Sequence, residues 1–259
     1  MKIVKLPGMK ILKLLTSKKS KGIKSLAILI DPDKVRDANH LNILIATCKT
    51  SEVDYVFVGG SLLVSGSLSE TIRSIKKISS IPVVLFPGSN LHIDKSADAI
   101  LFLSLISGRN PELLIGQHVA AAPIIKQANI EYLSTGYILI GSDISTTVAH
   151  VSQTFPIPSN KPEIAVCTAL AGEMLGMSLS YLDAGSGANE EVPPFLISEV
   201  QKSITVPLIV GGGINTIDKA RNAYEAGADM LVLGTSIERD LNFLKDVADL
   251  RDELNAKRS

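Results

Sequence analysis

The chain has 259 residues, of which 46% are apolar and 20% charged. This length suits one domain with a large core, so a single domain over residues 1–259 is expected. Its 26 basic and 26 acidic residues cancel, which leaves no electrostatic basis for a nucleic-acid partner. Because no apolar run reaches the roughly 18 residues of a membrane span and no signal-peptide core begins the chain, we expect a cytoplasmic protein. Cys48 and Cys167 lie far apart in helix-like segments and are predicted to be free, buried thiols.

The N-terminal segment has a local charge bias. Residues 1–24 include many lysines and no acidic residue. Interleaved apolar residues at 11, 12, 14 and 15 would give a short helix an apolar side. We therefore expect a basic extension or extra helix that packs on the domain with its lysines in solvent. The alternative is a weak, transient contact with an anionic membrane surface.

Short β-rich runs alternate with amphipathic stretches along the rest of the chain, a pattern typical of βα units around a parallel sheet. Seven of the expected strands span 25–30, 55–58, 82–86, 99–105, 137–140, 208–210 and 230–233. The remaining strand, sixth in chain order, ends at 181–182. The expected helices span 38–50, 69–78, 117–127, 163–175, 194–202, 217–226 and 241–254. Eight strands with intervening helices predict an α/β fold, a modified TIM (β/α)8 barrel.

Two segments depart from a regular barrel. The link between the third and fourth strands, residues 88–98, contains no good helix. A missing helix there would leave a gap in the outer ring, which could serve as a groove for a long apolar ligand. Residues 142–163, after the fifth strand, are irregular and rich in proline in their second half. This segment is interpreted as a lid or an oligomer contact.

Three late strand ends carry glycines. They are YLDAGSG at 181–187, GGG at 211–213 and the GT pair at 234–235. Each follows an apolar run and precedes a stretch that could begin a helix. Glycine lets backbone N–H groups approach an anion without a Cβ in the way, and helix N-termini favour anions. Because loops after the last strands of such barrels often share a phosphate site, the pattern predicts one here.

Few reactive side chains follow the strands. The carboxylates are Asp31, Asp33, Asp183 and Asp143, and no histidine or lysine ends an inner strand. Zinc chemistry and Schiff-base chemistry are therefore disfavoured. Asp183, beside the predicted phosphate site, is the best candidate for a general base, although an aspartate there can also cap a turn. Tyr181 would either hydrogen-bond the substrate or pack inside the barrel.

A hard-cation site is the second expectation. Asp31 and Ser61 end the first two strands. Adjacent strands lie about 4.8 Å apart, so both side chains could reach one Mg²⁺ that keeps waters and phosphate oxygens as its other ligands. Alternatively, Asp31 caps the turn that follows it. Lys34 and Arg109, in the loops after the first and fourth strands, would meet a second anion or remain in solvent.

Taken in order, these segments resemble geranylgeranylglyceryl phosphate synthases and the related heptaprenylglyceryl phosphate synthases. The shared motifs are LIDPDK at 29–34, VGGS at 58–61, LFPGS at 85–89, SGRNP at 107–111, YLDAGSG, GGGI and LGT. The resemblance implies a TIM-barrel prenyltransferase that uses Mg²⁺. It would join a polyprenyl group, expected to be geranylgeranyl, from its diphosphate to the 3-hydroxyl of sn-glycerol 1-phosphate, a step in ether-lipid biosynthesis.

The resemblance also implies roles for individual residues and a homo-oligomeric state. Asp31 and Ser61 would hold the metal, and Asp183 with Tyr181 would act in catalysis. The family often has Glu where this chain has Asp183, so the shorter carboxylate would act directly, through a water or with Tyr181. The implied glycerol phosphate site comprises Tyr181, Leu182, Asp183, Ala184, Gly185, Ser186, Gly187, Gly212, Gly213, Gly234 and Thr235.

Two other classes of function fit parts of the pattern. A sugar-phosphate isomerase or epimerase could use the same phosphate scaffold, but it needs an acid and a base paired across the barrel mouth. A non-catalytic phosphate- or lipid-binding barrel would bind glycerol phosphate without turnover.

Overall fold

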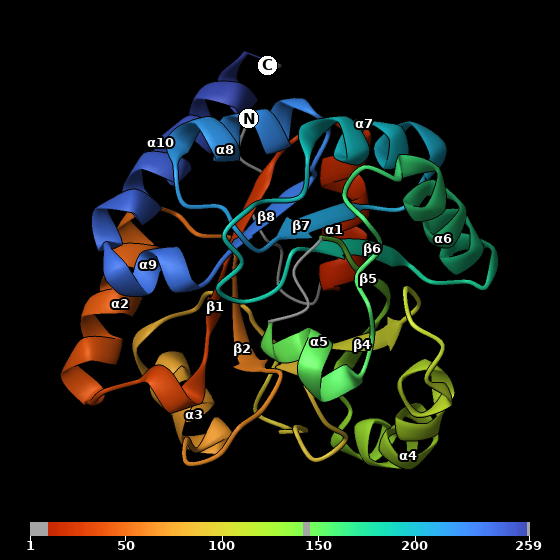
Figure 1. Ribbon diagram of the computed structural model, residues 1–259. Helices are drawn as coiled ribbons and strands as arrows, with labels where there is room; N and C mark the ends of the chain where they lie inside the picture. Colours follow the sequence, from red (N-terminus) through yellow and green to blue (C-terminus); the bar gives the residue numbers. More distant parts are fainter. Residues whose placement is uncertain (1–9, 142–145, 258–259) are drawn as a thin grey trace.

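The computed structural model describes residues 10–141 and 146–257. In it, eight parallel strands close into a barrel in chain order (Figure 1). They are β1 Ser25–Ile30, β2 Tyr55–Gly60, β3 Val83–Pro87, β4 Ala99–Leu105, β5 Glu131–Leu139, β6 Leu179–Asp183, β7 Leu208–Gly211 and β8 Met230–Leu233. The predicted modified (β/α)8 barrel is confirmed.

Helices surround the barrel. They are α1 Ile11–Ser20, α2 Ala38–Thr50, α3 Leu68–Ile78, α4 Gln117–Ala128, α5 Thr147–Ser152, α6 Pro162–Met174, α7 Pro194–Ser203, α8 Ile217–Glu225, α9 Thr235–Arg239 and α10 Leu241–Ala256, with a 3-10 turn η1 Pro32–Lys34 and a π-helical turn η2 Glu112–Gly116. None of the helices in the described ranges combines the length and apolar character that crossing a bilayer demands. Cys48 is buried as expected, but Cys167 is exposed; both are free.

Two elements differ from the expectation. β5 begins at Glu131, six residues before the predicted strand. The reason is that β4 pairs with β5 over the whole length of β4, from Ala99↔Glu131 to Leu105↔Tyr137. The segment predicted to be irregular contains α5 in its first half. The side chain of Thr146 accepts the amide of Ala149 and caps this short helix, and Gln153 ends it in a left-handed conformation.

Alternation along the strands separates two layers of core. Residues such as Ala27, Phe57 and Tyr181 point into the barrel, whereas their neighbours, such as Ile28 and Leu182, pack beneath the helices. Successive side chains on a strand point to opposite faces. On β6 the same alternation turns Tyr181 and Asp183 inward and Leu182 outward.

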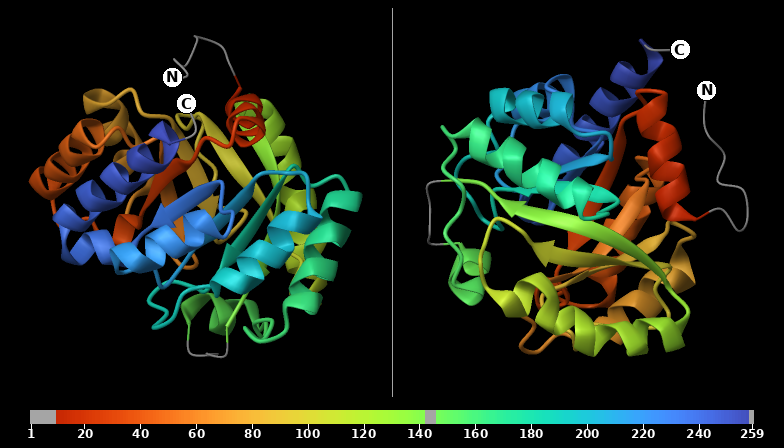
Figure 2. Two further views of the ribbon diagram at one scale, coloured as in Figure 1. Left: turned by 90° about the horizontal axis from the view of Figure 1, so that it is seen from above. Right: turned by 90° about the vertical axis from the view of Figure 1, so that its right-hand side faces the viewer.

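α1 closes one end of the barrel. Ile11, Leu14 and Leu15 pack against the inward-facing cluster, and α5 lies at the opposite end (Figure 2). Lys18 pairs with Asp54, Lys19 Nζ lies 3.0 Å from Asp229, and Lys24 Nζ donates to a backbone carbonyl at 2.7 Å. The expected helix is therefore present, and Lys18 and Lys19 hold it to the barrel. Lys10, Lys13 and Lys21 are exposed, as expected.

The link between β3 and β4 contains no helix, as predicted. Residues 88–98 cross this gap as turns, bends and irregular backbone. Asp94 anchors the link, since it accepts hydrogen bonds from the Ser69 hydroxyl of α3 and from the Ser96 amide. The outer ring is therefore interrupted between α3 and α4 (Figure 1).

Candidate active site

A polar cavity of about 560 Å³ lies at the ends of β6, β7 and β8. Its lining includes the glycine-rich strand ends that the sequence singles out, namely Gly185, Ser186, Gly187, Gly212, Gly213, Gly234 and Thr235. Tyr181 and Asp183 line its inner wall. Of the predicted binding residues, Leu182 and Ala184 do not line it, because their side chains belong to the core beneath the helices.

Glycine is required where the loops approach one another most closely. Gly212 has a φ of +79°, and a Cβ there would lie 2.6 Å from Asp183 Oδ1 and 2.7 Å from the Gly185 nitrogen. Gly213 has a φ of +69°, and its Cβ would meet the backbone of Glu190 at 2.2 Å. The β6 and β7 loops therefore pack backbone against backbone, an arrangement suited to binding an anion through amides.

Asp183 is buried at the inner wall, with its side chain held on both sides. The Tyr137 hydroxyl donates to Oδ2 at 2.5 Å, and the Gly185 amide donates to Oδ1 at 2.8 Å. Burial raises the pKa of Asp183 above the ordinary aspartate value, while these two hydrogen bonds oppose the rise. Burial, followed by the nearby Asp183 charge, raises the pKa of Tyr137 and Tyr181 well above the ordinary tyrosine value. The two hydroxyls therefore stay protonated, and the carboxylate is the group able to accept a proton.

Asp31 and Ser61 line one smaller cavity of about 130 Å³ beside the first. Asp31 Oδ1 accepts the Asp33 amide at 3.0 Å, so the alternative role as a turn cap is realised. A Cβ on Gly60 would lie 3.6 Å from Asp31 Oδ2, which puts this oxygen against the end of β2. Burial raises the pKa of Asp31, and the Asp33 amide and the Lys34 charge oppose the rise.

The neighbouring charged residues have other partners. Asp33 accepts the amides of Val64, Ser65 and Gly66, and so fixes the loop after β2. Lys34 Nζ lies 3.2 Å from Glu238. Arg109 donates to the carbonyl of Gly108 at 2.7 Å. Asp143, the remaining candidate carboxylate, lies outside the described residues.

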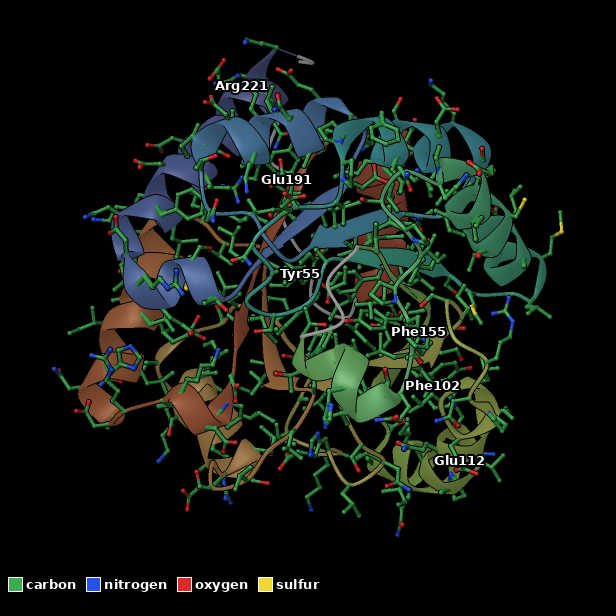
Figure 3. All side chains as sticks on the ribbon, viewed as in Figure 1. Tyr55, Phe102, Glu112, Phe155, Glu191 and Arg221 are labelled. Carbon is green, nitrogen blue, oxygen red and sulfur yellow. The ribbon has the colours of Figure 1, made fainter. Side chains whose placement is uncertain are left out.

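An apolar groove lies where the outer ring lacks a helix between β3 and β4. Its lining includes Phe86, Leu101, Phe102 and Leu105 from the strands and, from α4, Ala121 and Ile125. Figure 3 places Phe102 on the side of the barrel that faces α4. Phe102 and Ile125 also line a second cavity between α4 and α1. These two side chains therefore separate the groove from that cavity.

Two residues of the site, Tyr137 and Arg239, were not among the predicted ones. Tyr137 lies beside Tyr181 in the register of β5 and β6, so aligning the inward-facing positions of the two strands would have identified it. Arg239, at the end of α9, lines the polar cavity and adds a positive charge there. No local motif marks either residue.

Comparisons with known proteins find relatives that match most of the chain. A protein of Chitinophaga pinensis named geranylgeranylglyceryl phosphate synthase is 51% identical over 232 residues, which cover 90% of this chain and 92% of that protein. The structure of (S)-3-O-geranylgeranylglyceryl phosphate synthase from Thermoplasma acidophilum, in complex with its substrate sn-glycerol-1-phosphate, aligns with a TM-score of 0.88 at 32% identity. That alignment covers 95% of this chain and 99% of the other.

A more distant structure shares the fold alone. The N-acetylmannosamine-6-phosphate 2-epimerase of Clostridium perfringens aligns with a TM-score of 0.57 at 14% identity, over 94% of this chain and 97% of the epimerase. By contrast, the model of the PcrB family matches residues 20–250, nearly the whole barrel. Together with the 51% identity to the Chitinophaga protein, this match shows that the chain belongs to the PcrB family.

Proposed function

We propose that this protein is a Mg²⁺-dependent prenyltransferase of ether-lipid biosynthesis. It transfers a polyprenyl group, in our proposal geranylgeranyl, from its diphosphate to the 3-hydroxyl of sn-glycerol 1-phosphate. The named relatives and the substrate complex of the Thermoplasma enzyme support the reaction and the glycerol phosphate acceptor. The arrangement of cavities supports the prenyl diphosphate donor.

The observation that carries the proposal is the continuity of three cavities at the barrel mouth. The polar cavity and the Asp31 cavity share Leu29, Ser186, Gly234 and Thr235. The Asp31 cavity and the apolar groove in turn share Ser61 and Phe86. The three adjoining cavities therefore suit a phosphoester, a diphosphate and a hydrocarbon chain, in that order. The reacting atoms of the two substrates would lie between the phosphoester and the hydrocarbon chain.

The donors around Asp31 fit Mg²⁺. This ion prefers oxygen ligands and often takes only one or two from the protein, with waters and substrate phosphates as the rest. Asp31 and Ser61 would hold it. The described residues contain no group of three or more His, Cys, Asp or Glu side chains that could hold a metal ion. When bound, the ion would offset the charge that grows on the departing diphosphate.

The protein's own groups account for the other steps. Amides of the β6–β8 loops bind the glycerol phosphate, and the groove orients the allylic end of the prenyl chain toward it. The C–O bond to the diphosphate breaks, and its electron pair leaves with the diphosphate. The glycerol oxygen forms the new bond to the allylic carbon while its proton passes to Asp183.

A transfer assay tests the proposal. Purified protein with Mg²⁺, sn-glycerol 1-phosphate and geranylgeranyl diphosphate should yield the prenyl ether, and chelation of the ion should stop the reaction. Prenyl diphosphates of graded length, with product analysis, would define the donor. Tight binding of glycerol phosphate with no product from any donor would instead identify a binding protein.

We also propose that the protein is a homo-oligomer. Large apolar side chains are exposed at two places: Phe155, 78% exposed, in the segment after β5, and the adjacent Met174 and Leu175, 82% and 77% exposed, at the end of α6. Isolated surface apolar residues are common in monomers, but groups of them often mark interfaces. Light scattering of the purified protein tests this proposal, and a monomer at micromolar concentration would contradict it.

A further inference from the structure

The hydrogen bond between Tyr137 and Asp183 joins residues that line two different cavities. The Tyr137 side chain lines the apolar groove, whereas Asp183, to which it donates, lines the polar cavity. On the proposed function, the allylic carbon and the glycerol hydroxyl must meet between these two cavities. The 2.5 Å hydrogen bond therefore lies where the reaction takes place.

The surrounding rings fix the direction of the Tyr137 side chain. Its ring meets Phe86 edge to face at 6.0 Å and Tyr181 at 5.4 Å. Such contacts favour one orientation of each ring. The register of β5 and β6 pairs Tyr137 with Tyr181 and Leu139 with Asp183, so the hydroxyl reaches the carboxylate two positions farther along β6.

We propose that Tyr137 is a positioning residue that holds the Asp183 carboxyl group in one orientation at the junction of the two substrate cavities; this inference rests on the proposed function. The Gly185 amide engages Oδ1 and the Tyr137 hydroxyl engages Oδ2. Each carboxylate oxygen has a further lone pair, so one remains for the proton of the glycerol hydroxyl.

Few other groups can take over this role. In the described part of the chain, the ionisable side chains packed against Asp183 are Tyr137 from β5 and Tyr181 from β6. β7 presents only the glycines Gly211 and Gly212 to it. Loss of the Tyr137 hydroxyl would therefore leave the carboxylate with the Gly185 amide as its one remaining donor among these groups.

The test is Tyr137→Phe, which keeps the ring and removes the hydroxyl. A hydrogen bond to a charged group is worth enough to predict a loss of about 10- to 100-fold in kcat, while the Kd for glycerol 1-phosphate changes less than about twofold. Because the Tyr137 bond lowers the pKa of Asp183, its removal raises that pKa. The ascending limb of the pH–rate profile should therefore move up by about one to two pH units.

The matched control is Tyr132→Phe, the same substitution on the same strand. Tyr132 is 65% exposed at the other end of β5, so both kcat and the pH profile should stay as in the unmodified protein. A Tyr137→Phe enzyme with an unchanged profile and kcat would overturn the proposal.

A double-mutant cycle separates positioning from loss of structure. In the Asp183→Asn background, Tyr137→Phe should cause no further loss, since the carboxylate that it serves is gone. An equal loss in both backgrounds, or a Tyr137→Phe protein that no longer binds glycerol phosphate, would show a purely structural role and reject the inference. Absence of transfer by the unmodified protein would instead reject the proposed function itself.

Discussion

Gly212→Ala should disable the phosphate site in a way that can be separated from simple backbone strain. Gly212 has a φ of +79°, and an added Cβ would lie 2.6 Å from Asp183 Oδ1, 2.7 Å from the Gly185 nitrogen and 2.8 Å from the Ala184 nitrogen. The left-handed conformation alone costs an alanine about 1–2 kcal/mol. Two of the three clashes are with backbone, so the β6 loop must shift as well.

Gly176 provides the matched control. Its φ of +87° imposes similar strain, but a Cβ there would meet nothing within 4 Å. Gly176→Ala should therefore lower the free energy of unfolding by about 1–2 kcal/mol and leave binding intact. Gly212→Ala should in addition weaken binding of glycerol 1-phosphate at least about tenfold, equivalent to about 1.4 kcal/mol. Calorimetric titration and thermal unfolding of both variants test this, and equal affinities would refute the backbone-packed phosphate site.

Three further variants test other parts of the structure. Phe102→Ala should join the apolar groove to the cavity between α4 and α1. The longest prenyl diphosphate accepted in a competition assay should then increase, and an unchanged limit would show that Phe102 does not separate the two cavities. Arg251→Ala removes a guanidinium that is 3% exposed and pairs with Asp54 at 3.3 Å, and it should cost about 3–5 kcal/mol in urea unfolding. The control is Arg221→Ala, which removes a half-buried guanidinium paired with Glu253 near the surface and should shift the unfolding midpoint much less. Asp31→Asn should lose far more transfer activity than Asp33→Asn across a Mg²⁺ titration, because Asp33 is engaged by the amides of the β2 loop; equal losses would mean that Asp31 is not the ligand.

Most strand positions could be predicted because the strand is a short apolar run that ends at or just before a glycine, proline or aspartate, as in β1, β3 and β7. The same logic predicted that Asp31 and Ser61 would meet, since parallel neighbouring strands end at the same edge, and they do share a cavity. Strict alternation would also have excluded the side chain of Leu182 from the cavity. The absence of a helix between β3 and β4 could be predicted because the link between the two strands, residues 88–98, is short.

The remaining features depend on contacts between distant segments. Ser134 and Gly136 interrupt the apolar pattern of β5, and pairing with β4 makes the whole segment a strand. Tyr137 looks like an ordinary core residue in the sequence, and only the register with β6 shows that its hydroxyl reaches Asp183. Lys18 and Lys19 look like a solvated basic face, but Asp54 and Asp229 at the closed end of the barrel bind them.

A structure determined with glycerol 1-phosphate, Mg²⁺ and an unreactive prenyl diphosphate analogue tests the central claim most directly. It should show the phosphate against Gly185, Gly212 and Thr235, the diphosphate beside Asp31 and Ser61, and the prenyl chain along Phe86 and Phe102. A phosphate bound outside the β6–β8 loops, or an Asp31 carboxylate turned away from the cation, would contradict it.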